Sequence, residues 1–235
     1  MLKLINQKIL KSYKALCYAG TKLVLCKANK LYLYDIENST ISFLLALPYK
    51  IKIQNLSFSK KLRRLFRLDV SYAYYSKDID ILFAAVSGKI FEIEISKSKI
   101  IASYNLQRGS RVLNLIEVNN LLGFDNGIYF GEYFNNENGS PVSIYKRESK
   151  GEWTPIFTFG NSRIGHIHNL IVDNFRNCIW IFTGDKDKHV GIWKAEGNFE
   201  KVFAILKGDQ KFRACIALPL KDRIIYATDS QEKSN

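Results

Sequence analysis

Residues 166–206 read HIHNLIVDNFRNCIWIFTGDKDKHVGIWKAEGNFEKVFAIL. Four apolar runs, rich in aromatic and β-branched residues, are separated by the short polar segments NFRN, DKDK and EGN. Such runs, divided by Asn, Asp and Gly, are typical of antiparallel strands joined by hairpins. The stretch therefore predicts a four-stranded antiparallel meander, with its first strand starting at His166.

The same pattern recurs along the chain. Similar groups of strands occupy residues 13–58, 62–106 and 111–159, and an incomplete group follows 166–206 from residue 212 to residue 235. Four-stranded units that repeat every ~40–50 residues are the pattern of a β-propeller, whose blades bury their faces against one another. We predict an all-β propeller of four-stranded antiparallel blades, with about four and a half blades present in one domain over residues 1–235. The incomplete last blade suggests a truncated form of a larger propeller, or closure by the N-terminal segment LINQKIL.

Composition limits the class of protein. Hydrophobic residues make up 47% and charged residues 24% of the 235 residues, which is typical of a globular chain. No run approaches the roughly 20 apolar residues of a membrane helix, and the N-terminus lacks the apolar core of a secretory signal. We therefore expect a cytoplasmic protein. The oligomeric state is open.

The four cysteines show no metal-binding spacing, so we expect reduced, buried thiols. A two-residue turn at Gly20-Thr21 would place Cys17 opposite Val24, and Cys26 opposite Ala15.

Two turns resemble a known motif. The segments YKRESKGEWTPIF and IWKAEGNFEKVF are similar to shortened versions of the Ser-x-Asp-x-Gly-x-x-Trp turn, and retain Gly151-Glu152-Trp153 and Gly197-Asn198-Phe199. This turn marks sialidase-like, Asp-box (BNR-type) propellers, and the region from GIYFGEYF to CIWIFTGD resembles uncharacterised bacterial proteins of that group. The resemblance implies a propeller fold. It also implies that an active member would hold a sugar carboxylate with three arginines, and would use a tyrosine nucleophile with a glutamate partner and an aspartic acid.

The net charge of +13 indicates an anionic partner. Four expected loops between blades, at 60–67, 107–111, 160–166 and 208–213, contain 26 residues and seven of the ten arginines. Guanidinium groups bind carboxylates and phosphates through paired donors. We therefore expect a basic rim on one face, in which the anion-binding arginines recur at blade spacing: Arg67, Arg111, Arg163 and Arg213.

The meander also predicts a cluster on that face, because the start of a first strand lies beside the end of the second. In the fourth unit this brings together His166, His168 and Asp185, and the third unit contributes Glu132 and Tyr133. The histidines share a strand face with Leu170 and Val172. They are then channel-lining groups bonded to backbone, ligands for a glycan or anion, metal ligands with Asp185 or His189 completing the shell, or proton carriers. Because two histidines at i, i+2 form only half a shell, we expect no metal and no cofactor.

Three functions compete. The first is a non-catalytic propeller that binds an acidic glycan or protein partner through the basic rim. The second is a sialidase-like, carbohydrate-active enzyme for acidic saccharides, with the candidate catalytic residues His166, His168, Asp185, Glu132 and Tyr133. Consecutive strand residues point to opposite faces, so Glu132 and Tyr133 enter one site only if a bulge intervenes. The third, less favoured function is binding of nucleic acid or another polyanion.

Overall fold

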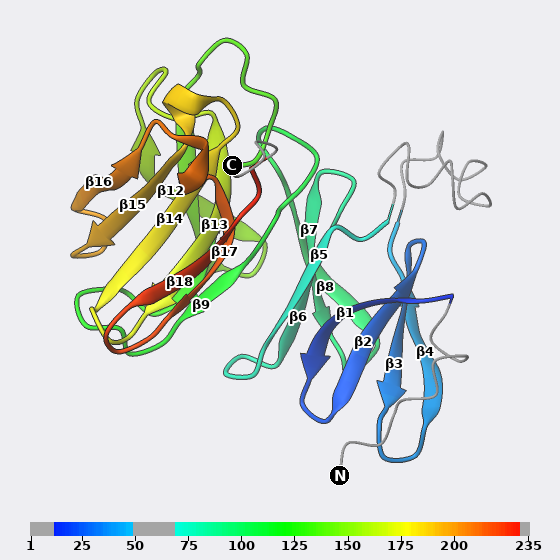
Figure 1. Ribbon diagram of the computed structural model, residues 1–235. Coiled ribbons are helices and arrows are strands. Elements are labelled where there is room, and N and C mark those ends of the chain that lie inside the picture. Colours follow the sequence, from blue (N-terminus) through cyan, green and yellow to red (C-terminus); the bar gives the residue numbers. More distant parts are fainter. Residues whose placement is uncertain (1–11, 49–68, 231–235) are drawn as a thin grey trace. The chain divides into compact units, whose positions relative to one another are not determined.

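The computed structural model describes residues 12–48 and 69–230. Over these ranges the chain forms eighteen β-strands and two short 3-10 turns, and no α-helix. The strands make four four-stranded antiparallel sheets and one two-stranded hairpin, and each strand pairs with its neighbours along the chain (Figure 1). In the described part of the chain there is no helix with the length and hydrophobicity needed to cross a bilayer.

The chain divides into two compact units, Met1–Leu106 and Gln107–Asn235. Each unit is considered by itself, and the prediction of a single domain stays a prediction.

The first unit contains two sheets with a shared core. Buried side chains from both sheets, among them Val24, Leu33, Leu82 and Phe91, form one hydrophobic cluster. The eight strands are β1 (Lys14–Ala19), β2 (Lys22–Lys27), β3 (Lys30–Asp35), β4 (Thr40–Ala46), β5 (Tyr72–Ser76), β6 (Ile81–Val86), β7 (Lys89–Glu94) and β8 (Lys99–Asn105).

The first hairpin tests the expected register. Cys17 lies opposite Val24, as predicted. Cys26 lies opposite Lys14 and not opposite Ala15, because a bulge between Ala15 and Cys17 shifts the pairing by one residue. All four cysteines are free thiols, as expected, but Cys215 is exposed and Cys17 is only partly buried, contrary to the expectation of burial.

The second unit contains two full sheets and the two-stranded hairpin. Its strands are β9 (Ile116–Val118), β10 (Gly127–Gly131), β11 (Val142–Ser149), β12 (Glu152–Phe159), β13 (His166–Asp173), β14 (Cys178–Gly184), β15 (Gly191–Glu196), β16 (Lys201–Lys207), β17 (Ala214–Pro219) and β18 (Ile224–Thr228). The 3-10 turns are η2 (Asp187–His189) and η3 (Gln210–Phe212). The observed four-stranded sheets span 14–46, 72–105, 116–159 and 166–207, and β5 begins ten residues after the predicted start of the second unit. The end of the first unit and residues 62–68 of the second lie outside the described ranges.

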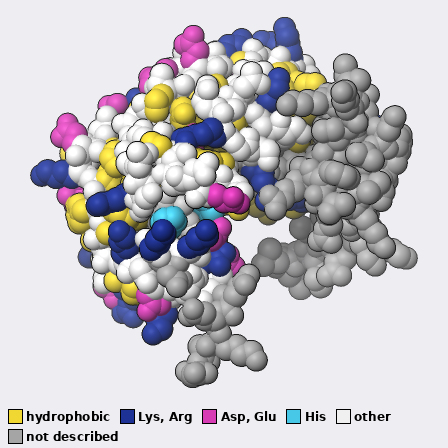
Figure 2. Space-filling view, turned by 90° about the horizontal axis from the view of Figure 1, so that it is seen from above, with side chains coloured by type: hydrophobic (Ala, Val, Ile, Leu, Met, Phe, Trp, Pro, Cys, Tyr) yellow, Lys and Arg dark blue, Asp and Glu magenta, His cyan; other side chains and the backbone are white. Residues whose placement is uncertain are grey.

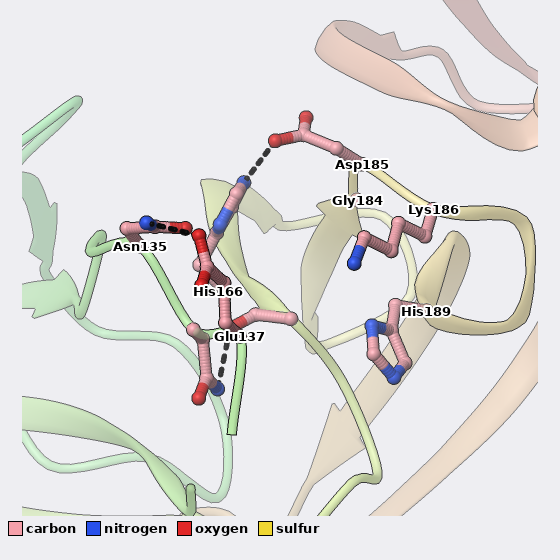
Figure 3. Close-up of a pocket in the computed structure, with 9 residues that line it drawn as sticks. Asn135, Glu137, His166, Gly184, Asp185, Lys186 and His189 are labelled. Carbon is pink, nitrogen blue, oxygen red and sulfur yellow. Dashed lines mark hydrogen bonds and ion pairs between the residues drawn. The ribbon is translucent and has the colours of Figure 1, made fainter. Parts of the chain in front are cut away.

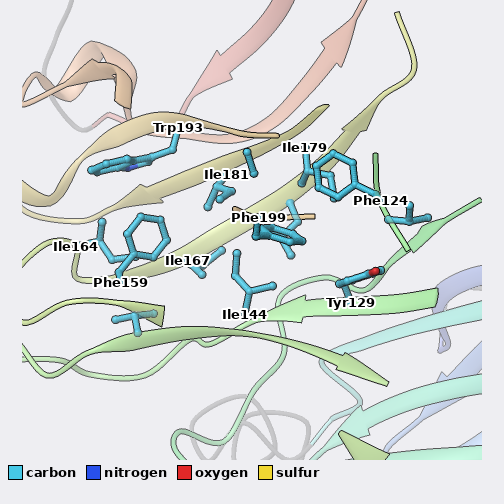
Figure 4. Packing of buried hydrophobic residues seen from close by; sticks show 14 of the residues in the cluster. Phe124, Tyr129, Ile144, Phe159, Ile164, Ile167, Ile179, Ile181, Trp193 and Phe199 are labelled. Carbon is cyan, nitrogen blue, oxygen red and sulfur yellow. The ribbon is translucent and has the colours of Figure 1, made fainter. Parts of the chain in front are cut away.

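The core of this second unit is built from large aromatic and aliphatic side chains (Figure 4). Trp193 is buried, and its ring packs edge-on against Phe159 at 5.1 Å between centroids. Phe199 packs against Phe124 in the same way at 5.5 Å. Phe199 follows Gly197-Asn198, one of the two motif-like turns, so this turn contributes an anchor to the core.

Candidate functional site

The predicted cluster forms where β13 begins and β14 ends. His166 pairs with Gly184, and Ile167 pairs with Thr183. The pairing then skips His168, since Asn169 lies opposite Phe182. His168 is therefore the extra residue of a β-bulge, and a bulge can redirect a side chain.

The bulge corrects one prediction. A regular strand would place Leu170 and Val172 on the face of the two histidines. Instead, Leu170 belongs with Ile167 to the hydrophobic core, and Val172 packs against the same core. The extra residue reverses the alternation, so the aliphatic residues face inward while His166 and His168 converge on Asp185.

Three side chains meet at one point in the site. The Nε2 atoms of His166 and His168 are 3.0 Å apart. Nε2 of His166 lies 3.3 Å from Oδ2 of Asp185, and Nε2 of His168 lies 3.2 Å from Oδ1. Figure 3 shows the His166 ring directed toward the Asp185 carboxylate. The sequence-based prediction that these three residues are neighbours is confirmed by the structure.

The surrounding residues hold both rings in place. The Tyr133 ring packs edge-on against His166 at 4.5 Å between centroids. Gly184 lies against the other ring, and an added Cβ would come within 2.9 Å of Nε2 of His168. Gly184 therefore leaves room for the His168 ring, which a larger residue at this position would displace.

Burial controls the protonation of the histidines. It lowers the pKa of His166 to about 4, although the charge of Asp185 acts in the opposite direction. Burial also lowers the pKa of His168, again against the influence of Asp185. Both rings are therefore neutral at neutral pH, and each can offer a nitrogen lone pair.

Arg213 joins this cluster from the loop before β17. Its Nη2 lies 3.0 Å from Oδ1 of Asp185 and 3.5 Å from Oδ2 of Asp229. The thiol of Cys215 lies 3.6 Å from Nδ1 of His168, on the side of the ring away from the Asp185 contact. Arg213 thus forms ion pairs with two carboxylates, those of Asp185 and Asp229.

A small open pocket borders the cluster (Figure 3). Its cavity volume is about 140 Å³. It is lined by Asn135, Asn136, Glu137, Gly165, His166, Gly184, Asp185, Lys186 and His189. Pockets for drug-sized ligands measure about 300–1,000 Å³, so this one suits water molecules or a small group of a larger partner.

Positive charge gathers beside the pocket. Lys188, Lys186 and Lys207 add to the effect of burial in lowering the pKa of His189. Arg163 and Lys207 both lie over the ring of Trp193, at 5.2 and 5.8 Å from its centroid. Lys and Arg side chains surround the histidines on this face (Figure 2).

The other predicted site residues are placed differently. The Glu132 carboxylate is buried, accepts hydrogen bonds from Arg108 and lies 2.8 Å from the backbone nitrogen of Ser143. Glu132 is therefore held by Arg108 and Ser143, whereas Tyr133 packs on His166.

The predicted arginines do not form one uniform rim. Arg111 forms a backbone bridge with Tyr133, near the histidines. Arg213 is paired with carboxylates, and Arg163 stacks on Trp193. Arg67 lies outside the described residues. The anion-binding role of these arginines stays a prediction.

Several neighbours of the site were not predicted. Gln210 donates from Nε2 to the Asp185 carbonyl at 3.1 Å, and Asn136 donates to the Gly165 carbonyl at 2.8 Å. For Cys215 the sequence predicted only a reduced, buried thiol, with no part in the site. None of these residues carries a sequence signal, because their contacts depend on how separate loops fold back onto the cluster.

Comparisons with known proteins give a fold. No protein-family model matches the chain, and no curated protein matches it. Solved structures do resemble it. A chain of the mitotic checkpoint complex matches with a TM-score of 0.58 and 10% identity, covering 90% of this chain and 56% of its own length.

Two further structures agree with this result. The β-propeller domain of Cps50 (Swd1) from Myceliophteria thermophila matches with a TM-score of 0.57 and 7% identity, over 92% of this chain and 62% of that chain. The extracellular domain of BT4673 from B. thetaiotaomicron, described as a one-component system, matches with a TM-score of 0.58 and 13% identity, over 93% of this chain and 26% of that chain. The chain thus spans less than two thirds of the length of each of these three chains.

At such low identities the likeness shows the fold alone. The chain is a β-propeller of four-stranded antiparallel blades, with about four and a half blades present, as the sequence predicted.

Proposed function

We propose that this chain is a non-catalytic binding propeller that holds an acidic group of a partner, a protein or a glycan, at the surface beside the pocket. The observation that carries the proposal is a set of four cations around the pocket and Trp193. We call this set the basic surface, and it consists of Arg163, Lys186, Lys188 and Lys207.

The basic surface lacks internal neutralisation. Among the side chains that the structure describes, none of the four cations lies within ion-pair distance of a carboxylate, whereas Arg108, Arg176 and Arg213 are all paired. Unpaired cations that lie together attract an acidic partner and accelerate its association.

The loops explain why these cations lie together. Lys186 and Lys188 belong to the connection between β14 and β15, while Arg163 precedes β13 and Lys207 ends β16. In an antiparallel meander all these positions fall at the same ends of the strands. A partner that approaches this end of the sheet meets all four charges at once.

The sialidase-like alternative receives less support from the geometry. That chemistry would need Glu132 and Tyr133 in one site as a glutamate and tyrosine pair. The Glu132 carboxylate is instead occupied by Arg108 and Ser143, and Tyr133 packs against His166. Turnover of a sialylated oligosaccharide by the chain would contradict the non-catalytic proposal.

The proposal is tested by fluorescence anisotropy with a labelled acidic peptide and a labelled sialylated oligosaccharide. The test variant is Lys186→Gln/Lys188→Gln/Lys207→Gln. The matched control is Lys150→Gln/Lys201→Gln/Lys221→Gln, which removes three lysines in or next to the turns at the opposite ends of the strands.

We expect the test variant to bind about tenfold more weakly, because three partly screened contacts contribute about 0.5 kcal/mol each. The control should bind like the wild type, since its charges lie away from the basic surface. Equal loss in both triple variants would mean that overall charge, and not this surface, attracts the probe. Stronger binding to a random DNA oligonucleotide, with affinity falling steeply between about 50 and 200 mM salt, would favour the polyanion alternative.

A further inference from the structure

The arrangement of His166, His168 and Asp185 suggests more than a hydrogen-bonded cluster. The two Nε2 atoms are 3.0 Å apart, and each faces a different oxygen of the Asp185 carboxylate: Nε2 of His166 lies 3.3 Å from Oδ2, and Nε2 of His168 lies 3.2 Å from Oδ1. In a tetrahedral site with metal–nitrogen and metal–oxygen bonds of about 2.0–2.1 Å, neighbouring ligand atoms are about 3.3 Å apart. One ligand atom from each of the three residues lies within 4.8 Å of the other two, so a cation can contact all three side chains with little movement.

Both histidines face Asp185 through Nε2. Nδ1 of His168 lies 3.6 Å from the thiol of Cys215. In metal sites one ring nitrogen of a histidine binds the ion, while the other contacts an outer partner. Nε2 of each ring is therefore the atom placed to bind a cation.

The cluster is rich in acceptor atoms. Both oxygens of the Asp185 carboxylate accept, and each Nε2 atom that carries no proton offers a lone pair. A cation between these atoms would be attracted by all of them.

Arg213 does not block the carboxylate. Its Nη2 contacts Oδ1 of Asp185, while Oδ2 faces His166. A carboxylate has about four lone-pair sites on its two oxygens, so it can serve Arg213 and a metal together. The nearby Asp229 carboxylate, 3.5 Å from Arg213, also offsets the positive charge of the guanidinium.

The pocket supplies room for further ligands. His166 and Asp185 line it, and its volume of about 140 Å³ holds a few water molecules. His189 lines the same pocket but is not one of the proposed ligands.

We propose that His166, His168 and Asp185 form a site for a divalent transition metal, with Zn²⁺ as the expected ion and water from the pocket completing its shell. Two imidazoles and one carboxylate favour Zn²⁺ and its neighbours over Mg²⁺ or Ca²⁺, which prefer shells of oxygen. Three protein ligands with an open fourth position are typical of zinc sites that bind an exogenous group. The metal site shares no residue with the basic surface, so a negative result for one proposal leaves the other unaffected.

The chain has only three histidines, so variants can test the contribution of each one to metal binding. The full chain is purified without a histidine tag, stripped with a chelator and titrated with Zn²⁺ at neutral pH against a chromophoric competitor. The test variants are His166→Gln/His168→Gln and Asp185→Asn. The matched control is His189→Gln, which removes the third histidine from the same pocket.

We expect one Zn²⁺ per chain in the wild type and in the control. The double variant should bind more than about 100-fold more weakly, beyond the roughly 10–100-fold that loss of an outer partner costs. Less than one Zn²⁺ per wild-type chain, or equal affinity in the double variant, would overturn the proposal.

A second measurement needs no variant, and so does not depend on whether the variants fold. Co²⁺ replaces Zn²⁺ in the wild-type chain, and the paramagnetically shifted proton spectrum is recorded in H₂O and in D₂O. Two histidine ligands bound through Nε2 should give two shifted Nδ1–H signals that disappear in D₂O. A spectrum with none or one of these signals would contradict the assigned ligands.

Discussion

Asp173 is the polar residue whose removal should most destabilise the second unit. It ends β13, its side chain is fully buried, and it accepts hydrogen bonds from four donors. The indole Nε1 of Trp180 lies 2.8 Å away, and Nη1 of Arg176 lies 2.9 Å away. The backbone N–H groups of Phe175 and Arg176, at 3.0 and 3.2 Å, contact the other carboxylate oxygen. Asp173 therefore holds the hairpin between β13 and β14.

The substitution Asp173→Asn keeps the two backbone contacts and removes the two side-chain contacts. The amide oxygen can still accept from the two backbone groups, but the amide nitrogen then faces two donors. The buried Trp180 Nε1 loses its acceptor, which costs about 2 kcal/mol. The Arg176 side chain is 27% exposed, and it keeps its hydrogen bond to the Leu220 carbonyl at 3.0 Å. The loss of its ion pair with Asp173 therefore costs only about 1 kcal/mol. We expect the free energy of unfolding to fall by about 3 kcal/mol.

Urea denaturation followed by tryptophan fluorescence measures this change. All three tryptophans, Trp153, Trp180 and Trp193, lie in the second unit, so the signal reports on that unit alone. With a slope of about 2 kcal/mol/M, the midpoint should fall by about 1.5 M. The control is Asp222→Asn, which removes an exposed carboxylate paired with Arg223 and should leave the midpoint unchanged. A loss below about 1 kcal/mol for Asp173→Asn would refute the reasoning, because an unpaired buried indole N–H costs at least that much.

The same residue predicts a pH dependence. Burial raises the pKa of Asp173, but the hydrogen bonds from Trp180 and Arg176 outweigh it, so the pKa lies below its ordinary value. A lowered carboxyl pKa contributes stability above the unfolded pKa of about 4, and this contribution is lost as the pH falls through the folded value. The difference in midpoint between wild type and Asp173→Asn should therefore stay constant from about pH 7 to 5 and narrow below about pH 4. If the difference in midpoint widened as the pH fell, the folded-state pKa of Asp173 would be raised and not lowered, and the prediction would be wrong.

Three further predictions concern single contacts. Thr183→Val should lower the free energy of unfolding by about 2 kcal/mol in urea titrations, because the Thr183 hydroxyl accepts from Trp193 Nε1 at 3.2 Å and donates to the His189 carbonyl at 2.8 Å; a neutral effect would show that these bonds are not needed. Gly131→Ala should cost about 1–3 kcal/mol, because the added methyl would lie 2.7 Å from Cβ of Ile167, and Ile167→Ala in the same chain should recover part of the loss in a double-mutant cycle. Iodoacetamide should label Cys215 faster than the other thiols when peptides are quantified by mass spectrometry. Burial raises the pKa of Cys215 too, but its side chain is exposed, whereas burial raises the pKa of Cys17 to about 12 and that of Cys178 to about 11. Rapid labelling of Cys178 would indicate that β14 opens.

The amino-acid pattern alone was enough for the sheets. Alternating aromatic and β-branched runs with polar turns at 174–177 and 197–200 define hairpins through local physics, since strand propensity and turn chemistry act over a few residues. Repetition of the unit led to the propeller, which the solved structures confirm. The meander also explains why His166 and Asp185 are neighbours, because antiparallel pairing brings the start of β13 beside the end of β14.

Tertiary structure decided the details of the site. The bulge at His168 turns the aliphatic side chains inward and brings the two imidazoles to 3.0 Å, and no residue in the local pattern marks it. Arg213 and Arg108 are separated from Asp185 and Glu132 by more than twenty residues, and whether an arginine is paired or open to a partner depends on which carboxylate the folded loops place beside it. Residue type and strand period can be read along the chain, whereas register shifts and long-range charge pairing arise only when distant segments compete for the same space.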